Sequence, residues 1–419
     1  MTHNQEPAIN VDLAHRYRPV GSSTFHLVTT IGAPMIDESD RAERPLLNLS
    51  FIVDRSGSMS GGTFDLARQG VEYAIGLLNK RDTMSLVVYD NEIDLLLSQR
   101  RANGAARDKA IRRLRRVRPR GSTALAEGWA TGCGQLAPLA DEQQQAICRT
   151  VLLTDGLANV GETDPAVLAR DAGVLASRGI TTTTFGVGQH FDEVLLAGMA
   201  DAGQGRYHYI ASNAGIVPVF AGELGELLHV TMRAVSLTLN LPVGWNARSL
   251  NDLPLTTSGR HITVGLGDVS SGAERAVVWE ITAPAAAPGA SETVGIELLW
   301  KTPAGAENRT ASRTHDIETS SDPGPAHEAA QEHIAAMLSA RAQAEALEHN
   351  RAGRYDLATQ AVQARQRAMP ASAAGKQYIA DLTAFAQEVS APMSAEALKD
   401  RHFRSRRAAR TQKDYSVEE

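Results

Sequence analysis

Cysteine, aromatic residues and long apolar runs are scarce in this sequence, and each scarcity excludes a class of protein. Two cysteines, Cys133 and Cys148, are too few to staple a chain of 419 residues, and they do not form a metal-ligand pair pattern. No stretch approaches the roughly 18 consecutive apolar residues of a membrane-spanning helix. Residues 1–20 are charged and lack an apolar core, which is not the pattern of a secretory signal. We therefore expect a cytoplasmic chain with no membrane span and two inert thiols.

The composition is that of an ordinary globular protein, but its charge is unevenly spread. Charged residues make up 21% of the chain, and the length predicts two to three domains. Residues 100–120 carry a net charge of +9 and residues 399–413 a net charge of +6. Because the whole chain carries −6, the remaining residues sum to −21. An acidic body with two basic segments indicates a surface that selects partners by the sign of their charge.

The region from Leu47 to about Gly188 alternates short apolar runs with helical spacing. This alternation predicts a doubly wound α/β domain with a mainly parallel sheet, covered by helices on both faces. Asp164 followed by Pro165 predicts the start of one helix, and Asp192 predicts the cap of another. The strands are expected at 47–53, 84–89, 150–154 and 180–187, and the other helices at 64–78, 105–117 and 124–136.

Segments on both sides of this domain follow the two-residue period of half-buried strands. Because an isolated N-terminal strand has nothing to pair with, we expect one β-sandwich interrupted by the α/β domain. Beyond the breaker cluster at 319–325 the pattern is that of a helical bundle. The predicted divisions are strands of the sandwich in 1–45, the α/β domain in 46–231, the rest of the sandwich in 232–320, helices in 325–398, and a basic, flexible tail in 399–419.

Oxygen-bearing side chains cluster where predicted strands end. Asp54, Ser56 and Ser58 directly follow the first strand of the α/β domain, Thr123 lies in a later loop, and Asp155 follows the third strand. Ligands bind at the carboxyl ends of the strands in open parallel sheets, so these residues are expected to face one crevice. Two carboxylates and three hydroxyls, with no Cys or His, suit Mg²⁺, with Mn²⁺ or Ca²⁺ as alternatives, and disfavour Zn²⁺ or copper.

These residues, in this order and spacing, resemble the metal-ion-dependent adhesion site of the von Willebrand factor type A domain. The resemblance covers about Leu46 to Thr231, including the runs 185–188 and 205–209, which are common in bacterial members. It implies that Ser56, Ser58 and Thr123 bind the metal directly, while Asp54 and Asp155 bind it directly or through water. It also implies a fold resembling that domain and a partner system such as a MoxR-type AAA+ ATPase.

The resulting hypothesis is a non-enzymatic, Mg²⁺-dependent scaffold or adaptor that binds a partner's Asp or Glu at the metal. No phosphate-binding loop is present, and no histidine accompanies the metal residues in sequence, although folding can bring His190 or His208 near. We expect His190 to be solvated and do not predict an enzyme, which leaves a metal-assisted hydrolase as a third reading.

A second class of function rests on the basic segments. The predicted basic helix of residues 100–120 and the basic tail form the alternative, a nucleic-acid-binding protein. No aromatic residue interleaves the first segment, so base stacking is unsupported. The helix can instead steer an acidic partner toward the metal site, or form a plain solvated face.

Overall fold

The computed structural model describes residues 6–21, 24–35, 44–142, 146–188, 190–210, 216–303, 308–409 and 412–413. The chain forms two compact units. The α/β unit comprises Asp37–Arg233 and Lys301–Glu307, and the sandwich unit comprises Met1–Ile36, Ala234–Trp300 and Asn308–Glu419. The α/β unit therefore interrupts the sequence of the sandwich unit, as the flanking strand pattern predicts.

A six-stranded sheet forms the centre of the α/β unit. Its strands lie in the order β6-β5-β4-β7-β8-β9. All neighbouring pairs are parallel except β5 and β6, which are antiparallel. The central strands are buried on both faces, which explains their continuous apolar runs. The strands are β4 Leu46–Asp54, β5 Thr83–Tyr89, β6 Ile93–Arg101, β7 Ala146–Thr154, β8 Ile180–Val187 and β9 Gln204–Ile210.

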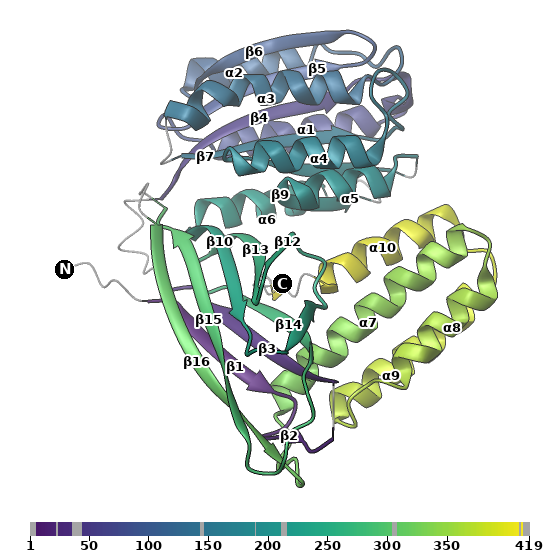
Figure 1. Cartoon of the computed structure of the whole chain (residues 1–419). Helices are drawn as coiled ribbons and strands as arrows, with labels where there is room; N and C mark the ends of the chain where they lie inside the picture. Colours follow the sequence, from purple (N-terminus) through teal and green to yellow (C-terminus); the bar gives the residue numbers. More distant parts are fainter. Residues whose placement is uncertain are drawn as a thin grey trace. The chain divides into compact units, whose positions relative to one another are not determined.

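Helices cover both faces of this sheet, as Figure 1 shows. The main core joins one face to α1, α2 and α6, while α3 and α4 pack on the other face. The side chain of Asp164 caps α4 with Pro165 in its first turn, and that of Asp192 caps α5, so both predicted helix starts are confirmed. The helices are α1 Thr63–Leu77, α2 Gly104–Leu114, α3 Leu125–Glu142, α4 Pro165–Ser177, α5 Glu193–Ala202 and α6 Ile216–Leu228, with a short 3₁₀ turn, η2, at Gly57–Met59.

The prediction that residues 100–120 form one basic helix is wrong, because the segment begins in strand β6. It forms the edge of the sheet, with Leu97 as its one buried residue, and its half-exposed sequence gives little apolar periodicity. Arg100 and Arg101 lie in β6, whereas α2 ends at Leu114 and the chain beyond forms a turn and a loop. Residues 100–120 are therefore not a single basic helix.

The sandwich unit contains two sheets. One has the order β1-β3-β14-β11, with β17 also paired to β14, and the other has the order β12-β13-β10-β15-β16-β2. Arg313 of β16 donates a hydrogen bond to the carbonyl of Ile9 in β1 at 2.7 Å, a contact between the sheets. The strands are β1 Ala8–Leu13, β2 Arg18–Pro19, β3 Thr24–Gly32, β10 Val230–Asn240, β11 Asn246–Ser249, β12 Leu255–Ser258, β13 His261–Ser270, β14 Glu274–Thr282, β15 Ser291–Lys301, β16 Asn308–Ser320 and β17 Gln412–Lys413.

The described part of the sandwich unit also contains four helices. Helix α7 covers the outer face of β3 and β14, where Ile334 and Leu338 share a core with Val28 and Val278. A second core joins α7 to α8 and α9 around Leu347, a helical bundle of the predicted kind. The helices are α7 Glu328–Arg351, α8 Tyr355–Gln366, α9 Ala373–Val389 and α10 Ala395–Ala409.

Helix α10 changes the interpretation of the basic tail. It continues to Ala409 and buries His402 and Ser405, so the segment from Lys399 begins inside a packed helix rather than as a flexible tail. Its arginines form ion pairs: Arg401 with Glu388 at 2.6 Å, Arg404 with Asp400 at 3.0 Å and Arg406 with Asp252 at 3.0 Å. Residues 414–419, the end of the predicted tail, lie outside the described residues.

Candidate metal site

Four of the five predicted site residues lie at or just beyond the carboxyl ends of neighbouring strands, and Thr123 lies in the loop between α2 and α3. β4 ends at Asp54, and β7, its parallel partner, ends at Thr154 directly before Asp155. The register of the two strands aligns Val53 with Leu153, so Asp54 and Thr154 are level with each other. Ser56 directly precedes the 3₁₀ turn after β4. The side chain of Met59, at the end of this turn, is buried and anchors it.

Short hydrogen bonds connect four of these side chains. The backbone N–H of Ser56 donates to Asp54 Oδ1 at 2.7 Å. The Oγ atoms of Ser56 and Ser58 are 3.0 Å apart, and Ser58 Oγ donates to Asp155 Oδ1 at 2.7 Å. Thr154 Oγ1 donates to Asp54 Oδ2 at 2.5 Å and so fixes the orientation of that carboxylate. The D-x-S-x-S segment and the later Asp155 thus form one connected group.

Gly156 shows that Thr123 belongs to the same group. A Cβ built on Gly156 would lie 3.2 Å from Ser58 Oγ, 3.3 Å from Thr123 Oγ1 and 3.8 Å from Asp54 Oδ2. Oxygen atoms from three chain segments therefore surround one point, which a side chain at residue 156 would obstruct. Thr123 is held there by Asn159, whose Oδ1 accepts a hydrogen bond from the Thr123 N–H at 2.8 Å.

The two carboxylates are buried without a compensating cation. Burial outweighs the hydrogen bonds from Thr154 and Ser56, so the pKa of Asp54 is raised to about 6. Burial also raises the pKa of Asp155, against the opposing effects of Ser58 and of His190. Within the described residues, neither carboxylate forms an ion pair. Two buried negative groups so close together favour a bound cation or a proton.

The neighbouring arginines are engaged elsewhere. Arg55, between Asp54 and Ser56, lies 3.2 Å from Asp90 and 2.6 Å from Asp94, and Arg120 lies 2.8 Å from Asp90. Burial raises the pKa of Asp90, but the N–H of Glu92 and the two guanidinium groups outweigh it and lower that pKa overall. This network fixes the rim of the site and leaves the charges of Asp54 and Asp155 uncompensated.

The donor set fits a small hard cation. In the part of the chain that the structure describes, no cluster of three or more His, Cys, Asp or Glu side chains is placed to hold a metal. Any metal held here must therefore use hydroxyl oxygens, and this group supplies three of them beside two carboxylates. Such oxygen-only, partly neutral coordination suits Mg²⁺ and leaves room for water or an outside ligand.

The mouth of the group is partly apolar. Ser58 is exposed, whereas Asp54, Ser56, Thr123 and Asp155 are buried. The loop after Asp155 presents two exposed apolar side chains, Leu157 at 56% and Val160 at 36% of full exposure, and the N–H of Val160 donates to the carbonyl of Thr123.

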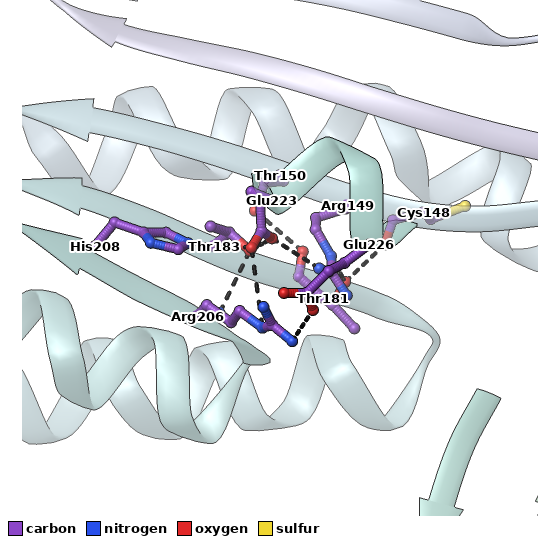
Figure 2. A network of polar contacts seen from close by, with 9 residues as sticks. All are labelled: Cys148, Arg149, Thr150, Thr181, Thr183, Arg206, His208, Glu223 and Glu226. Carbon is purple, nitrogen blue, oxygen red and sulfur yellow. Dashed lines mark hydrogen bonds and ion pairs between the residues drawn. The ribbon is translucent and has the colours of Figure 1, made fainter. Parts of the chain in front are cut away.

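A second polar cluster, shown in Figure 2, contains none of these five residues. At its centre is Glu223 of α6, whose Oε1 accepts from Arg149 at 2.9 Å and from Thr183 at 2.8 Å. His208 Nε2 lies 3.1 Å from Glu223 Oε2, and its ring stacks on Phe185. The cluster ties α6 to β7, β8 and β9. His208 is therefore bound to Glu223, while His190 is exposed, as expected.

Two residues that support the group carry weak or no sequence signals. Thr154 donates a hydrogen bond to Asp54. Its place at the end of a strand, directly before Asp155, is a weak indication in the sequence that it lies near the site. Asn159 bonds to a residue 36 positions away, and no local pattern indicates that contact.

Known proteins are similar to this chain in sequence and in fold. The family model of the von Willebrand factor type A domain matches residues 48–219. An uncharacterised protein of Synechocystis sp. is 27% identical over 292 residues, which cover 67% of each chain. Escherichia coli YfbK, also uncharacterised, is 26% identical over 64% of this chain, which spans about half of that protein. The E3 ubiquitin-protein ligase WAV3 of Arabidopsis thaliana is 22% identical over 65% of this chain and 35% of its own.

Solved structures share the fold at low sequence identity. A von Willebrand factor type A protein from Catenulispora acidiphila aligns with a TM-score of 0.71 at 18% identity, covering 92% of this chain and 88% of its own. The ArnB paralog VWA2 from Sulfolobus acidocaldarius aligns with a TM-score of 0.61 at 13% identity, covering 97% and 98%. No helix among the described residues is long and apolar enough to cross a membrane.

Proposed function

We propose, from the premise that residues 48–219 form a von Willebrand factor type A domain, that the chain is a divalent-cation-dependent protein-interaction scaffold or adaptor. The observation that carries the proposal is the convergence of two buried, unpaired carboxylates and three hydroxyls at one edge of the sheet. Such a group is poorly suited to a metal-free fold, because each buried charge costs free energy without a partner.

The proposed cation is Mg²⁺, with Mn²⁺ or Ca²⁺ as alternatives. Ser56, Ser58 and Thr123 would hold it directly, and Asp54 and Asp155 would hold it directly or through water. When bound, an ion with few carboxylate ligands supplies an electrophilic position for an outside oxygen. Ser58, the exposed residue of the group, marks its open side.

The proposed partner supplies an Asp or Glu side chain to that position. Leu157 and Val160 offer apolar contact area beside it, so a partner with an apolar residue near its carboxylate fits the mouth best. A MoxR-type ATPase system as the source of the partner, and a cytoplasmic location, remain predictions from the sequence.

The other readings have less support. Nucleic-acid binding rests on the basic segments, and the ion pairs of Arg401 and Arg406 reduce the charge that α10 presents. A hydrolase needs an acid or base positioned beside the metal. The contact of His208 with Glu223 gives that histidine another role, and His190, whose charge acts on Asp155, is exposed. The ligase activity named for WAV3 belongs to a protein of which this chain spans about a third.

The test is thermal unfolding in EDTA and in Mg²⁺, Mn²⁺ or Ca²⁺. A cation at 100 times its dissociation constant is expected to stabilise the protein by about 2.7 kcal/mol, because it binds only the folded state. Ser58→Ala is expected to lose most of this stabilisation, since it removes one ligand and the hydrogen bond to Asp155.

Ser60→Ala is the matched control, because Ser60 is an exposed serine of the same loop and lies outside the group. It is expected to retain the full metal-dependent shift. If none of the three cations raises the unfolding midpoint of the unmodified protein, the metal-dependent mechanism is wrong.

A further inference from the structure

A row of cationic side chains lies along α2, and we name it the α2 stripe. It consists of Lys109, Arg112, Arg113 and Arg116, the last in the turn that follows the helix. Their spacing of three, four and seven residues places them along one side of the helix. The side chains of Ala106, Ala110 and Leu114 bury a different side.

The charge of the α2 stripe is largely uncompensated. Arg113 donates to the carbonyl of Leu96 in β6, and the side chains of Lys109, Arg112 and Arg116 form no hydrogen bond or ion pair with any described residue. Asp108 is the single acidic residue of α2. In contrast, Arg115 on another side of the helix is paired with Glu72 of α1 at 2.7 Å.

The topology directs the α2 stripe toward the candidate metal site. β6 runs antiparallel to β5, so it ends at the edge of the sheet opposite Asp54. Helix α2, which lies beside β6 in Figure 1, then returns toward the carboxyl-end edge. The loop that follows carries Gly121, whose carbonyl accepts from the Gly57 N–H at 3.0 Å, and then Thr123. The positive row therefore approaches the mouth along one flank.

The cations at the mouth itself do not extend this field. Arg55 and Arg120 are neutralised by Asp90, Glu92 and Asp94. A ligand that follows the positive charge is thus guided by α2 and not by the rim. Neither β6 nor α2 contains an aromatic side chain on which a base can stack, which argues against single-stranded nucleic acid.

We propose that the α2 stripe binds an acidic polypeptide segment whose additional carboxylates flank the one bound at the metal site. This proposal rests on the proposed function and specifies its partner: a run of Asp or Glu rather than a single acidic residue. Charge complementarity of this kind acts mainly on the association rate and on selectivity, because arginines exposed to water gain little from each individual pair.

The experiment measures the binding of a fluorescein-labelled peptide of about ten glutamates to the full chain by anisotropy, in Mg²⁺ and in EDTA. Wild type is expected to bind in Mg²⁺ and to weaken in EDTA. Arg112→Glu with Arg116→Glu is expected to weaken binding about tenfold in Mg²⁺ through the lost positive field. A glutamine peptide of equal length should not bind.

The matched control is Lys80→Glu with Arg81→Glu, an equal change of charge at two exposed residues of the α1–β5 loop, at the opposite edge of the sheet. It is expected to bind within about twofold of wild type, since its charges lie far from the mouth. Equal loss in both double variants overturns the proposal, because only net charge would then matter.

Other outcomes separate this proposal from the proposed function. If the α2 variant binds like wild type while EDTA still weakens binding, the α2 stripe is excluded and the metal site stands. If EDTA and Ser58→Ala leave peptide binding unchanged, both proposals fail. Absence of binding by wild type, or tighter binding of poly(U) RNA that the α2 variant loses, also overturns the acidic-peptide assignment.

Discussion

Asp54 and Asp90 are two buried aspartates at one edge of the same sheet, with opposite electrostatic surroundings. Asp90 is paired with Arg55 and Arg120, whereas Asp54 faces hydroxyl groups and a second carboxylate. Asp54→Asn is therefore expected to raise the free energy of unfolding in EDTA by about 1 kcal/mol, because it removes an uncompensated buried charge. The same variant should lose the stabilisation by Mg²⁺, and urea unfolding with and without Mg²⁺ measures both effects.

Asp90→Asn provides the comparison with the same chemical change. It is expected to cost about 3 kcal/mol, because it leaves Arg55 without its buried partner. If Asp54→Asn destabilises the EDTA-treated protein as much as Asp90→Asn does, the carboxylate of Asp54 has a structural role that needs no metal.

At the scale of elements, one buried carboxylate adds polar contacts to the apolar packing that attaches α6 to the sheet. Glu223 contacts Arg149 of β7, Thr183 of β8 and His208 of β9. Glu223→Gln is expected to reduce the free energy of unfolding at pH 7 by about 3–5 kcal/mol, because the buried guanidinium of Arg149 loses the carboxylate charge at its Nη1. Glu226→Gln, on the same helix but partly exposed, should cost at most about 1 kcal/mol.

The contribution of Glu223 also depends on pH. Burial raises the pKa of Glu223, but His208, Arg149 and Arg206 outweigh burial and hold the pKa well below its ordinary value of 4.5. A depressed carboxyl pKa stabilises the fold above pH 4.5, and this contribution is lost as the pH falls below that value. Between pH 5 and pH 3, wild type should therefore lose more stability than Glu223→Gln, as measured by urea unfolding.

Elements with a strong local pattern could be predicted, and those that depend on distant partners could not. The residues after β4 and β7 were predictable as one group, because the ends of parallel strands meet at one edge. The edge strand β6 escaped prediction, since one exposed face weakens its period. The Glu223 cluster joins residues up to 74 positions apart, and α10 is ordered by contacts with α7 and Asp252. Contacts between residues so far apart in sequence produce no local sequence pattern from which they could be predicted.

At the scale of the whole molecule, a substitution in the core of one unit is expected to destabilise that unit and not the other. Trp279 is fully buried in β14, and its Nε1 donates to Thr29 of β3 at 3.2 Å. Trp279→Ala is expected to cost the sandwich unit about 3–5 kcal/mol, because it leaves a large cavity. The site residues lie in the other unit, so stabilisation by Mg²⁺ should persist in this variant.

Hydrogen exchange measured by mass spectrometry distinguishes the two units. In Trp279→Ala, protection should fall in β3 and β14 and remain in β4 and β7. Equal loss in both pairs of strands would mean that the chain unfolds as one cooperative body.

The pairing of β3 with β14 also determines when β3 can fold during translation. These strands join along Thr24–Gly32 and Glu274–Thr282, with the whole α/β unit between them in sequence. At a translation rate of roughly 5–20 residues per second, about 12–50 s pass between the synthesis of β3 and that of β14. During that time Leu27, Val28 and Ile31, all buried in the finished fold, have no cover from β14 or α7. Early folding of the α/β unit shortens the free chain between the two strands, and chaperones have a defined segment to shield until β14 emerges.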